Sequence, residues 1–171
     1  RRESKVRLFK HIQQMCLLHV EIFRAANQIK LLYLIDAYVR MAEGENPLGM
    51  YASARALLEF NAFLHEVRSR LQGPCEQGEA KWRQAGEEFF ALIVRARFGT
   101  SDPEKAALVR SAGGPAGALK PFHIMECIKN LSKETDHEAA NARYDRLCDF
   151  VHHNLSSQTL ANAGSAIMSS A

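Results

Sequence analysis

The residues best suited to chemistry lie near the end of the chain, in the segment 144–154 (YDRLCDFVHHN). An imidazole that titrates near neutral pH, held by a carboxylate and set beside an arginine that grips a phosphate, is a suitable general base for breaking an RNA backbone. Arg146, Asp149 and His152 supply these three groups. Tyr144, His153 and Asn154 are the supporting candidates around them.

The two histidines of this segment face different directions if the segment is helical. At about 100° per residue, His152 shares a face with Asp149, whereas His153 lies almost in line with Arg146. A structural interpretation is also open: Tyr144 belongs to the core, a histidine bonds a neighbouring helix, and Arg146 pairs with Asp149 on the surface. The segment therefore predicts either a catalytic site or an ordinary packed helix.

A second pair of charged residues lies one helical turn apart, inside the apolar run 54–60. Arg55 and Glu59 are expected to be partly buried there, and such a pair can orient a neighbouring histidine. The alternative is an intrahelical ion pair that stabilises the helix by roughly a few tenths of a kcal/mol. The sequence leaves both interpretations open.

Other kinds of site have weaker support in the sequence. Cys148 has His152 four residues later, but a half-buried helix position favours an inert thiol over a nucleophile. The repeated Glu-x-x-His spacing of di-iron bundles is absent, and zinc would need scattered ligands. The glycine-rich segment 113–117 lacks the lysine and the preceding strand of a phosphate loop. We therefore expect neither a metal nor a cofactor.

The elements that position these residues are helices. Apolar residues recur at intervals of three and four, and clusters of Gly and Pro separate the periodic runs. The predicted helices cover 4–43 (one helix, or two joined near 26–27), 50–71, 79–97, 103–111, 121–133 and 138–154. Asp102 is expected to cap the short fourth helix, with Pro103 at its first position. The pattern predicts an all-α fold, an antiparallel bundle of four to five main helices plus a short helix.

Composition limits the remaining possibilities. With 171 residues, of which 47% are hydrophobic, the chain is long enough for one compact core, which we place at 1–155, followed by a Ser/Ala-rich tail at 156–171. A formal charge of +3 permits a nucleic-acid partner without indicating one. Four widely spaced cysteines favour a reduced, cytoplasmic setting. No apolar stretch approaches the roughly 20 residues needed to cross a bilayer, so no membrane partner is expected.

Two segments of the chain resemble known helical families. Arg146 followed by His152 or His153 resembles the Arg-x(4 to 6)-His signature of the HEPN superfamily, small helical bundles that include RNA-cleaving toxins and phage-defence proteins. The spacing of Tyr144, Leu147, Val151 and His152 is also similar to the Tyr-x-x-Leu-Ser-x-x-Val-His-Pro segment of bacterial helical proteins of the DUF5677 type.

In the DUF5677-type proteins an upstream helix carries an Arg-x-x-x-Glu pair, which Arg55 and Glu59 match here. This sequence has Cys148 where that family has Ser and His153 where it has Pro. Without that proline the helix can continue one residue further.

The HEPN resemblance implies metal-independent cleavage of RNA by a homodimer with paired arginines and histidines. It assigns those roles to Arg146 and His152, with His153 as the alternative. The competing hypothesis is a non-catalytic helical module that binds a protein or a small ligand. An open cleft at Arg146, His152 and Asn154 would favour the enzyme, whereas histidines in the core or under the tail would favour binding.

Overall fold

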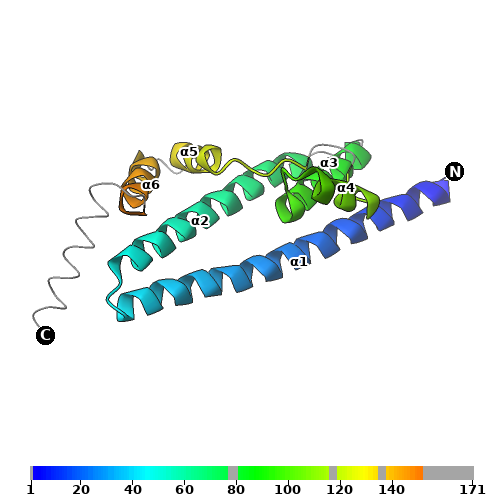
Figure 1. Cartoon of the computed structure of the whole chain (residues 1–171). Helices are drawn as coiled ribbons and strands as arrows, with labels where there is room; N and C mark the ends of the chain where they lie inside the picture. Colours follow the sequence, from blue (N-terminus) through cyan, green and yellow to red (C-terminus); the bar gives the residue numbers. More distant parts are fainter. Residues whose placement is uncertain (1, 77–80, 116–118, 135–137, 152–171) are drawn as a thin grey trace, which may run out of the picture. The chain divides into compact units, whose positions relative to one another are not determined.

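The structure is a computed structural model that describes residues 2–76, 81–115, 119–134 and 138–151. These ranges contain six helices and no strand, which confirms the predicted all-α bundle (Figure 1). The helices are α1 (Arg2–Glu43), α2 (Pro47–Glu76), α3 (Trp82–Phe98), α4 (Pro103–Ser111), α5 (Ile124–Glu134) and α6 (Glu138–Val151). None of them has a stretch long and apolar enough to cross a membrane.

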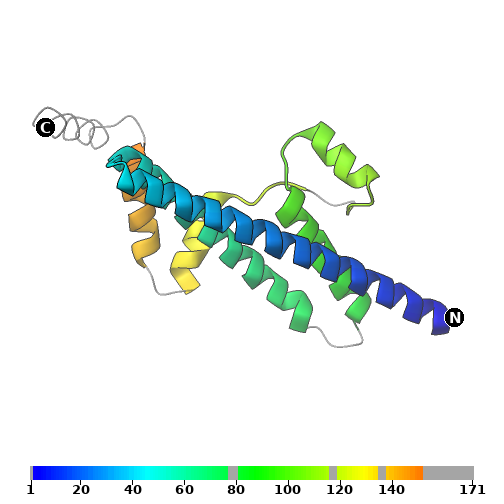
Figure 2. The same cartoon turned by 90° about the horizontal axis from the view of Figure 1, so that it is seen from below.

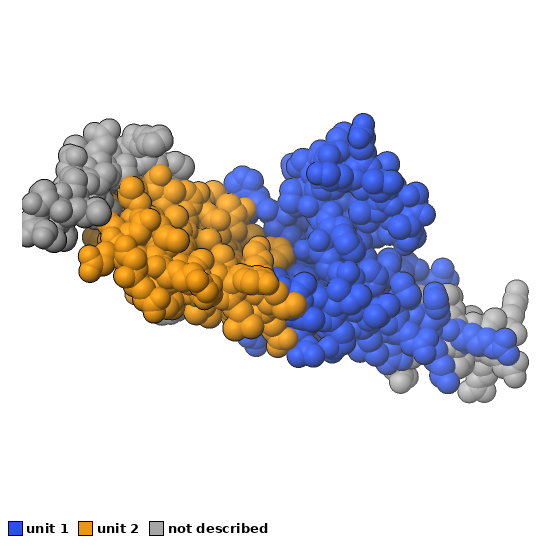
Figure 3. Space-filling view, turned by 60° about the horizontal axis from the view of Figure 1, so that its bottom comes forward, with its two compact units in different colours: residues 1–27, 65–123 blue, residues 28–64, 124–171 orange. Residues whose placement is uncertain are grey.

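The chain divides into two compact units, each built from two separate segments (Figure 3). Unit 1 comprises Arg1–Asn27 and His65–His123, and unit 2 comprises Gln28–Leu64 and Ile124–Ala171. Neither unit is continuous in sequence, because the two long helices α1 and α2 each contribute residues to both. The expectation of one domain over 1–155 stays a prediction.

Unit 2 begins with the hairpin between the end of α1 and the start of α2. Glu45 adopts a left-handed backbone conformation (φ 50°), and the Asn46 side chain accepts a hydrogen bond from the Gly49 amide at 2.9 Å. Asn46 thus caps α2, with Pro47 at its first position. A Cβ on Gly49 would overlap the Met41 side chain, so a larger residue there would require that side chain to move.

The core of unit 2 forms where α5 and α6 pack together and where α2 supplies buried residues. Its buried apolar residues are Phe60, Ala62, Cys127, Ile128, Leu131, Ala140 and Tyr144. On α5 the inner face includes Cys127, whereas Met125, which the apolar pattern places inward, is 44% exposed. The prediction for Met125 was wrong because the buried face of α5 is centred on Cys127, Ile128 and Leu131, and Met125 lies at its edge, about 100° away around the helix. Ser132 is also buried, and its hydroxyl donates to the Ile128 carbonyl at 3.0 Å.

Unit 1 contains α3 and α4 together with the remaining parts of α1 and α2. Its buried apolar residues are Val67, Ala85, Ile93, Val94 and Leu119. The Thr100 amide donates to the Leu119 carbonyl at 2.7 Å, which holds the segment before α5 against the end of α3. Gly99 permits this close approach, because a Cβ there would lie 2.7 Å from the Arg95 carbonyl oxygen and 3.1 Å from Pro121 Cα.

The start of α5 differs from the prediction for a specific reason. The helix begins at Ile124 and not at Pro121, because the preceding Phe122 is held outside it. The Arg95 and Arg70 guanidinium carbons lie 4.3 and 5.3 Å from the Phe122 ring centroid, within the range of cation–π attraction. Arg95 also donates through Nε to the Lys120 carbonyl at 2.7 Å.

The end of α2 also differs from the prediction, since the helix continues past Gly73 and Pro74 to Glu76. A proline normally disfavours the helical conformation of the residue before it, partly through that residue's Cβ. Gly73 has no Cβ, which removes this part of the conflict. By contrast, α4 begins as predicted: the Asp102 side chain accepts from the amides of Glu104 and Lys105 at 2.9 and 3.3 Å.

Candidate functional site

The structure brings together three of the predicted site residues in unit 2. The Arg55 Nε donates to Glu59 Oε1 at 2.9 Å, and the Tyr144 hydroxyl donates to the same oxygen at 3.0 Å. Arg55 Nη2 in turn donates to the Tyr144 hydroxyl at 3.2 Å, and its guanidinium carbon lies 5.3 Å from the tyrosine ring centroid. We call Arg55, Glu59 and Tyr144 the tyrosine cluster; it joins α6 to α2.

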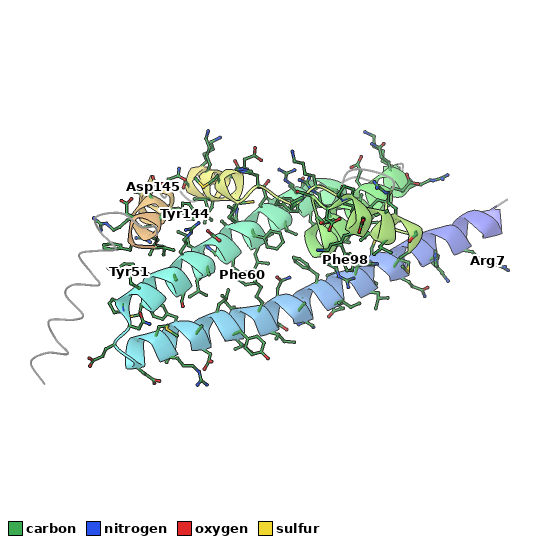
Figure 4. The ribbon with its side chains drawn as sticks, in the orientation of Figure 1. Arg7, Tyr51, Phe60, Phe98, Tyr144 and Asp145 are labelled. Carbon is green, nitrogen blue, oxygen red and sulfur yellow. The ribbon has the colours of Figure 1, made fainter. Side chains whose placement is uncertain are left out.

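The tyrosine cluster forms because each partner is placed by its own helix. Arg55 and Glu59 are four residues apart on α2 and therefore lie on one face. Tyr144 is only 4% exposed, so its ring belongs to the core of unit 2 while its hydroxyl reaches the charged pair. Figure 4 shows Tyr144 between α6 and α2, with the exposed Asp145 on the outer side of α6. Arg55 and Glu59 are therefore not only an ion pair within α2, because both also bond Tyr144 on α6.

Electrostatics keep the cluster in a defined protonation state. Burial raises the pKa of Tyr144 to about 12, and its hydrogen bond to Glu59 acts in the same direction. The hydrogen bond to Glu59 also raises the pKa of Arg55, against the effect of burial. At neutral pH the tyrosine is thus a neutral donor and the arginine a cation, as this geometry requires.

Cys148 lies one turn beyond Tyr144 on α6 and is a free, half-buried cysteine. The cysteine contributes to the raised pKa of Tyr144 and interacts with the charge of Arg55. A second contact joins the same helices further along: the rings of Tyr51 and Phe150 are stacked, with centroids 4.1 Å apart and an interplanar angle of 23°. Sequence periodicity did not identify this stack, since it does not reveal which aromatic residues face each other.

Arg146 lies apart from the tyrosine cluster. It is two residues after Tyr144, and two residues correspond to about 200° around a helix, so the two side chains leave α6 in nearly opposite directions. Arg146 and Asp149 are both exposed. Within the part of the chain that the structure describes, Arg146 forms no ion pair or hydrogen bond. The expected surface pair between Arg146 and Asp149 is therefore wrong, and the guanidinium is left accessible to an anion.

The remaining predicted residues, His152, His153 and Asn154, lie outside the described residues. No group of three or more histidine, cysteine or acidic side chains suited to holding a metal occurs among the described residues. Comparisons of the chain with known protein families, with curated proteins and with solved structures give no match.

Proposed function

We propose that this chain is a HEPN-like helical domain that cleaves RNA without a metal, in a toxin or phage-defence setting. The observation that carries the proposal is the tyrosine cluster. Tyr144 belongs to the segment that resembles both families, and Arg55 and Glu59 match the upstream pair of the DUF5677-type proteins. These two segments, 85 residues apart at Glu59 and Tyr144, are hydrogen-bonded to each other. The cluster thus supports a shared site architecture and makes Arg55 and Glu59 positioning residues for α6.

The proposed reaction assigns one role to each polar group. Arg146 holds the phosphate, because its exposed guanidinium has no protein partner among the described residues and can form a bidentate pair with phosphate oxygens. An imidazole, His152 or alternatively His153, removes the proton from the RNA 2′-hydroxyl as that oxygen attacks phosphorus. The bond from phosphorus to the 5′-oxygen breaks, and the leaving oxygen receives a proton from a second imidazole or from water.

A homodimer would supply the second imidazole, and an apolar face of α1 supports this assembly. Within unit 2, Ile29, Leu32, Tyr33 and Val39 on α1 are all exposed, and Leu32 is 67% exposed. Large apolar side chains grouped on one helix commonly mark a protein interface. A second copy of the chain is the occupant that the composite site requires.

The test of cleavage compares RNA turnover by the parent and three variants in the presence of a chelator. We expect His152→Ala to lower the rate roughly 10²- to 10⁴-fold, as for loss of a general acid or base. Arg146→Ala should lower it roughly tenfold or more through loss of charge-assisted hydrogen bonds. Arg110→Ala is the matched control, since Arg110 is an exposed arginine on α4 in unit 1, away from the segment of Arg146. Equal activity in all four proteins would remove the proposal.

The test of assembly is sedimentation equilibrium of the parent and of Leu32→Glu. A carboxylate at this exposed position should dissociate the dimer and abolish cleavage without unfolding the chain. Asn61→Asp adds a negative charge to an exposed position on α2, outside this face, and serves as the control. A parent that is monomeric at all concentrations and still cleaves RNA would contradict the composite site.

A specific observation favours the second candidate function, a non-catalytic helical module that binds a small ligand. Unit 1 contains a cavity of about 340 Å³ between α1, α3 and α4, far in sequence from Arg146. Small-molecule pockets usually occupy about 300–1,000 Å³ and are mostly apolar with a few polar groups. Binding of any small molecule to this cavity by a chain without nuclease activity would favour this candidate.

A further inference from the structure

The cavity of unit 1 has almost entirely apolar walls. Met15 and His19 line it from α1, Phe90 and Phe98 from α3, and Leu108 and Val109 from α4. Among the described lining residues, His19 is the one polar side chain. Figure 2 shows α4 as a separate helix carried between two loops after the end of α3. A ligand here must therefore be mainly apolar, with its polar group close to His19.

The tautomer of His19 follows from its contact with Arg97. Arg97 Nη1 lies 2.5 Å from His19 Nδ1, and a guanidinium can only donate, so Nδ1 is the acceptor. The ring is then neutral and carries its proton on Nε2. Burial and the charge of Arg97 both lower the pKa of His19, which favours the same neutral form. Edge contacts with Phe90 and Phe98, at centroid distances of 5.3 and 6.5 Å, hold the ring in place.

The Nε2–H group of His19 is available to a ligand. Within the described part of the chain, the contact with Arg97 is the one hydrogen bond that His19 makes. The ring is half-buried, so a ligand oxygen that displaces water from this N–H group would form a hydrogen bond partly shielded from solvent.

The positive charge of Arg97 favours a negatively charged oxygen on the ligand. Arg97 is half-buried, lies over the Phe98 ring at 4.6 Å, and forms no ion pair with a described carboxylate. Burial lowers its pKa, as expected when a cation loses water without gaining an anion. An anionic ligand group next to His19 would offset this cost, whereas an ammonium group would increase it.

The rim of the cavity indicates an apolar body for the ligand. Leu108 on α4 is 69% exposed, and α4 has no buried residue. An occupant would remove part of this apolar surface from water, at roughly 25 cal/mol per Å² of area covered. The cavity therefore combines apolar walls with one hydrogen-bond donor, the Nε2–H group of His19, and with the cation Arg97 bonded to the same ring.

We propose that unit 1 binds a small carboxylic acid with an apolar body, whose carboxylate accepts the hydrogen bond from His19 Nε2. Arg97 is a positioning residue that orients the imidazole and supplies the favourable charge. This inference deepens the ligand-binding function proposed above and is independent of RNA cleavage.

The test is calorimetry of the full chain with three probes of equal length: octanoate, 1-octanol and octylamine. Octanoate should bind tightest and octylamine weakest. His19→Phe keeps an aromatic ring but removes the donor, and should weaken octanoate binding roughly tenfold or more while changing octanol binding little. His123→Phe, at an exposed histidine of the same unit that does not line the cavity, is the matched control.

A second variant keeps the test decisive if His19→Phe does not fold. Ala112 is an exposed lining residue, so Ala112→Trp should fill the cavity and abolish binding of all three probes. Equal affinity for octanoate and octanol, or unchanged octanoate binding by either variant, would overturn the assignment of a carboxylate to His19. Failure of the parent to bind any probe would remove both this inference and the ligand-binding function.

Discussion

Replacing Tyr144 with phenylalanine isolates the contribution of one hydroxyl group to the tyrosine cluster. The buried ring is retained, so the change creates almost no cavity. What is lost is the donation to Glu59 at 3.0 Å and the acceptance from Arg55 at 3.2 Å. The experiment therefore measures how strongly the link between α6 and α2 depends on polar contacts.

The expected loss of stability follows from the exposure of the two partners. A hydrogen bond to a charged group contributes roughly 1.5–3 kcal/mol. The Arg55 and Glu59 side chains are 23% and 30% exposed, so water can replace part of what the hydroxyl provided, and they keep their own ion pair. We therefore expect Tyr144→Phe to lower the free energy of unfolding by about 1–2 kcal/mol.

Urea unfolding followed by circular dichroism measures this difference. Tyr38→Phe is the matched control, because Tyr38 is half-buried in the same unit and its hydroxyl bonds no described residue, so the same change there should cost less than about 0.5 kcal/mol. A double-mutant cycle with Glu59→Gln then tests the pair directly, with an expected coupling of roughly 0.5–1.5 kcal/mol. If Tyr144→Phe were as stable as the parent and the cycle showed no coupling, the tyrosine cluster would not stabilise unit 2.

Three further predictions follow from single features of the structure. The fold raises the pKa of Tyr144 to about 12, from about 10 in an unfolded chain, and so favours its neutral form. This shift should contribute roughly 2–3 kcal/mol to the free energy of unfolding below pH 10, and the contribution should be lost as the pH rises towards 12. In a pH titration, tyrosinate absorbance should show a late component that Tyr144→Phe removes. Asp102→Ala should cost about 1 kcal/mol and speed amide exchange in α4, whereas Asp102→Asn should retain the cap and much of the protection. Gly113→Ala should cost about 1 kcal/mol in urea unfolding through its φ of 88° alone, because a Cβ there meets nothing within 4 Å; an unchanged midpoint would contradict this.

The helices could be predicted because their signals are local. The continuous α1, the capped start of α4 at Asp102 and the turn before Pro47 each follow from residues within a few positions of one another. The two errors differ in origin: Gly73, a local feature, allows α2 to continue through Pro74, whereas Phe122 is held before α5 by two arginines that are distant in sequence.

The candidate site was predictable only in part. The spacing of Arg55 and Glu59 predicted their pairing, because four residues complete about one helical turn. The same rule gave no pair between Arg146 and Asp149, although exposed pairs form on α1 and α3. Helical spacing thus shows which pairs can meet but not which of them do.

The sequence by itself determined the helical class, the approximate helix limits and the face on which each charged residue lies. Only the tertiary structure decided that Tyr144 completes the Arg55–Glu59 pair and that Arg97 sets the tautomer of His19. These partners are separated by 85–89 and 78 residues. Helical periodicity says which side of a helix is buried, but the partner on that side is chosen by the packing of the whole unit.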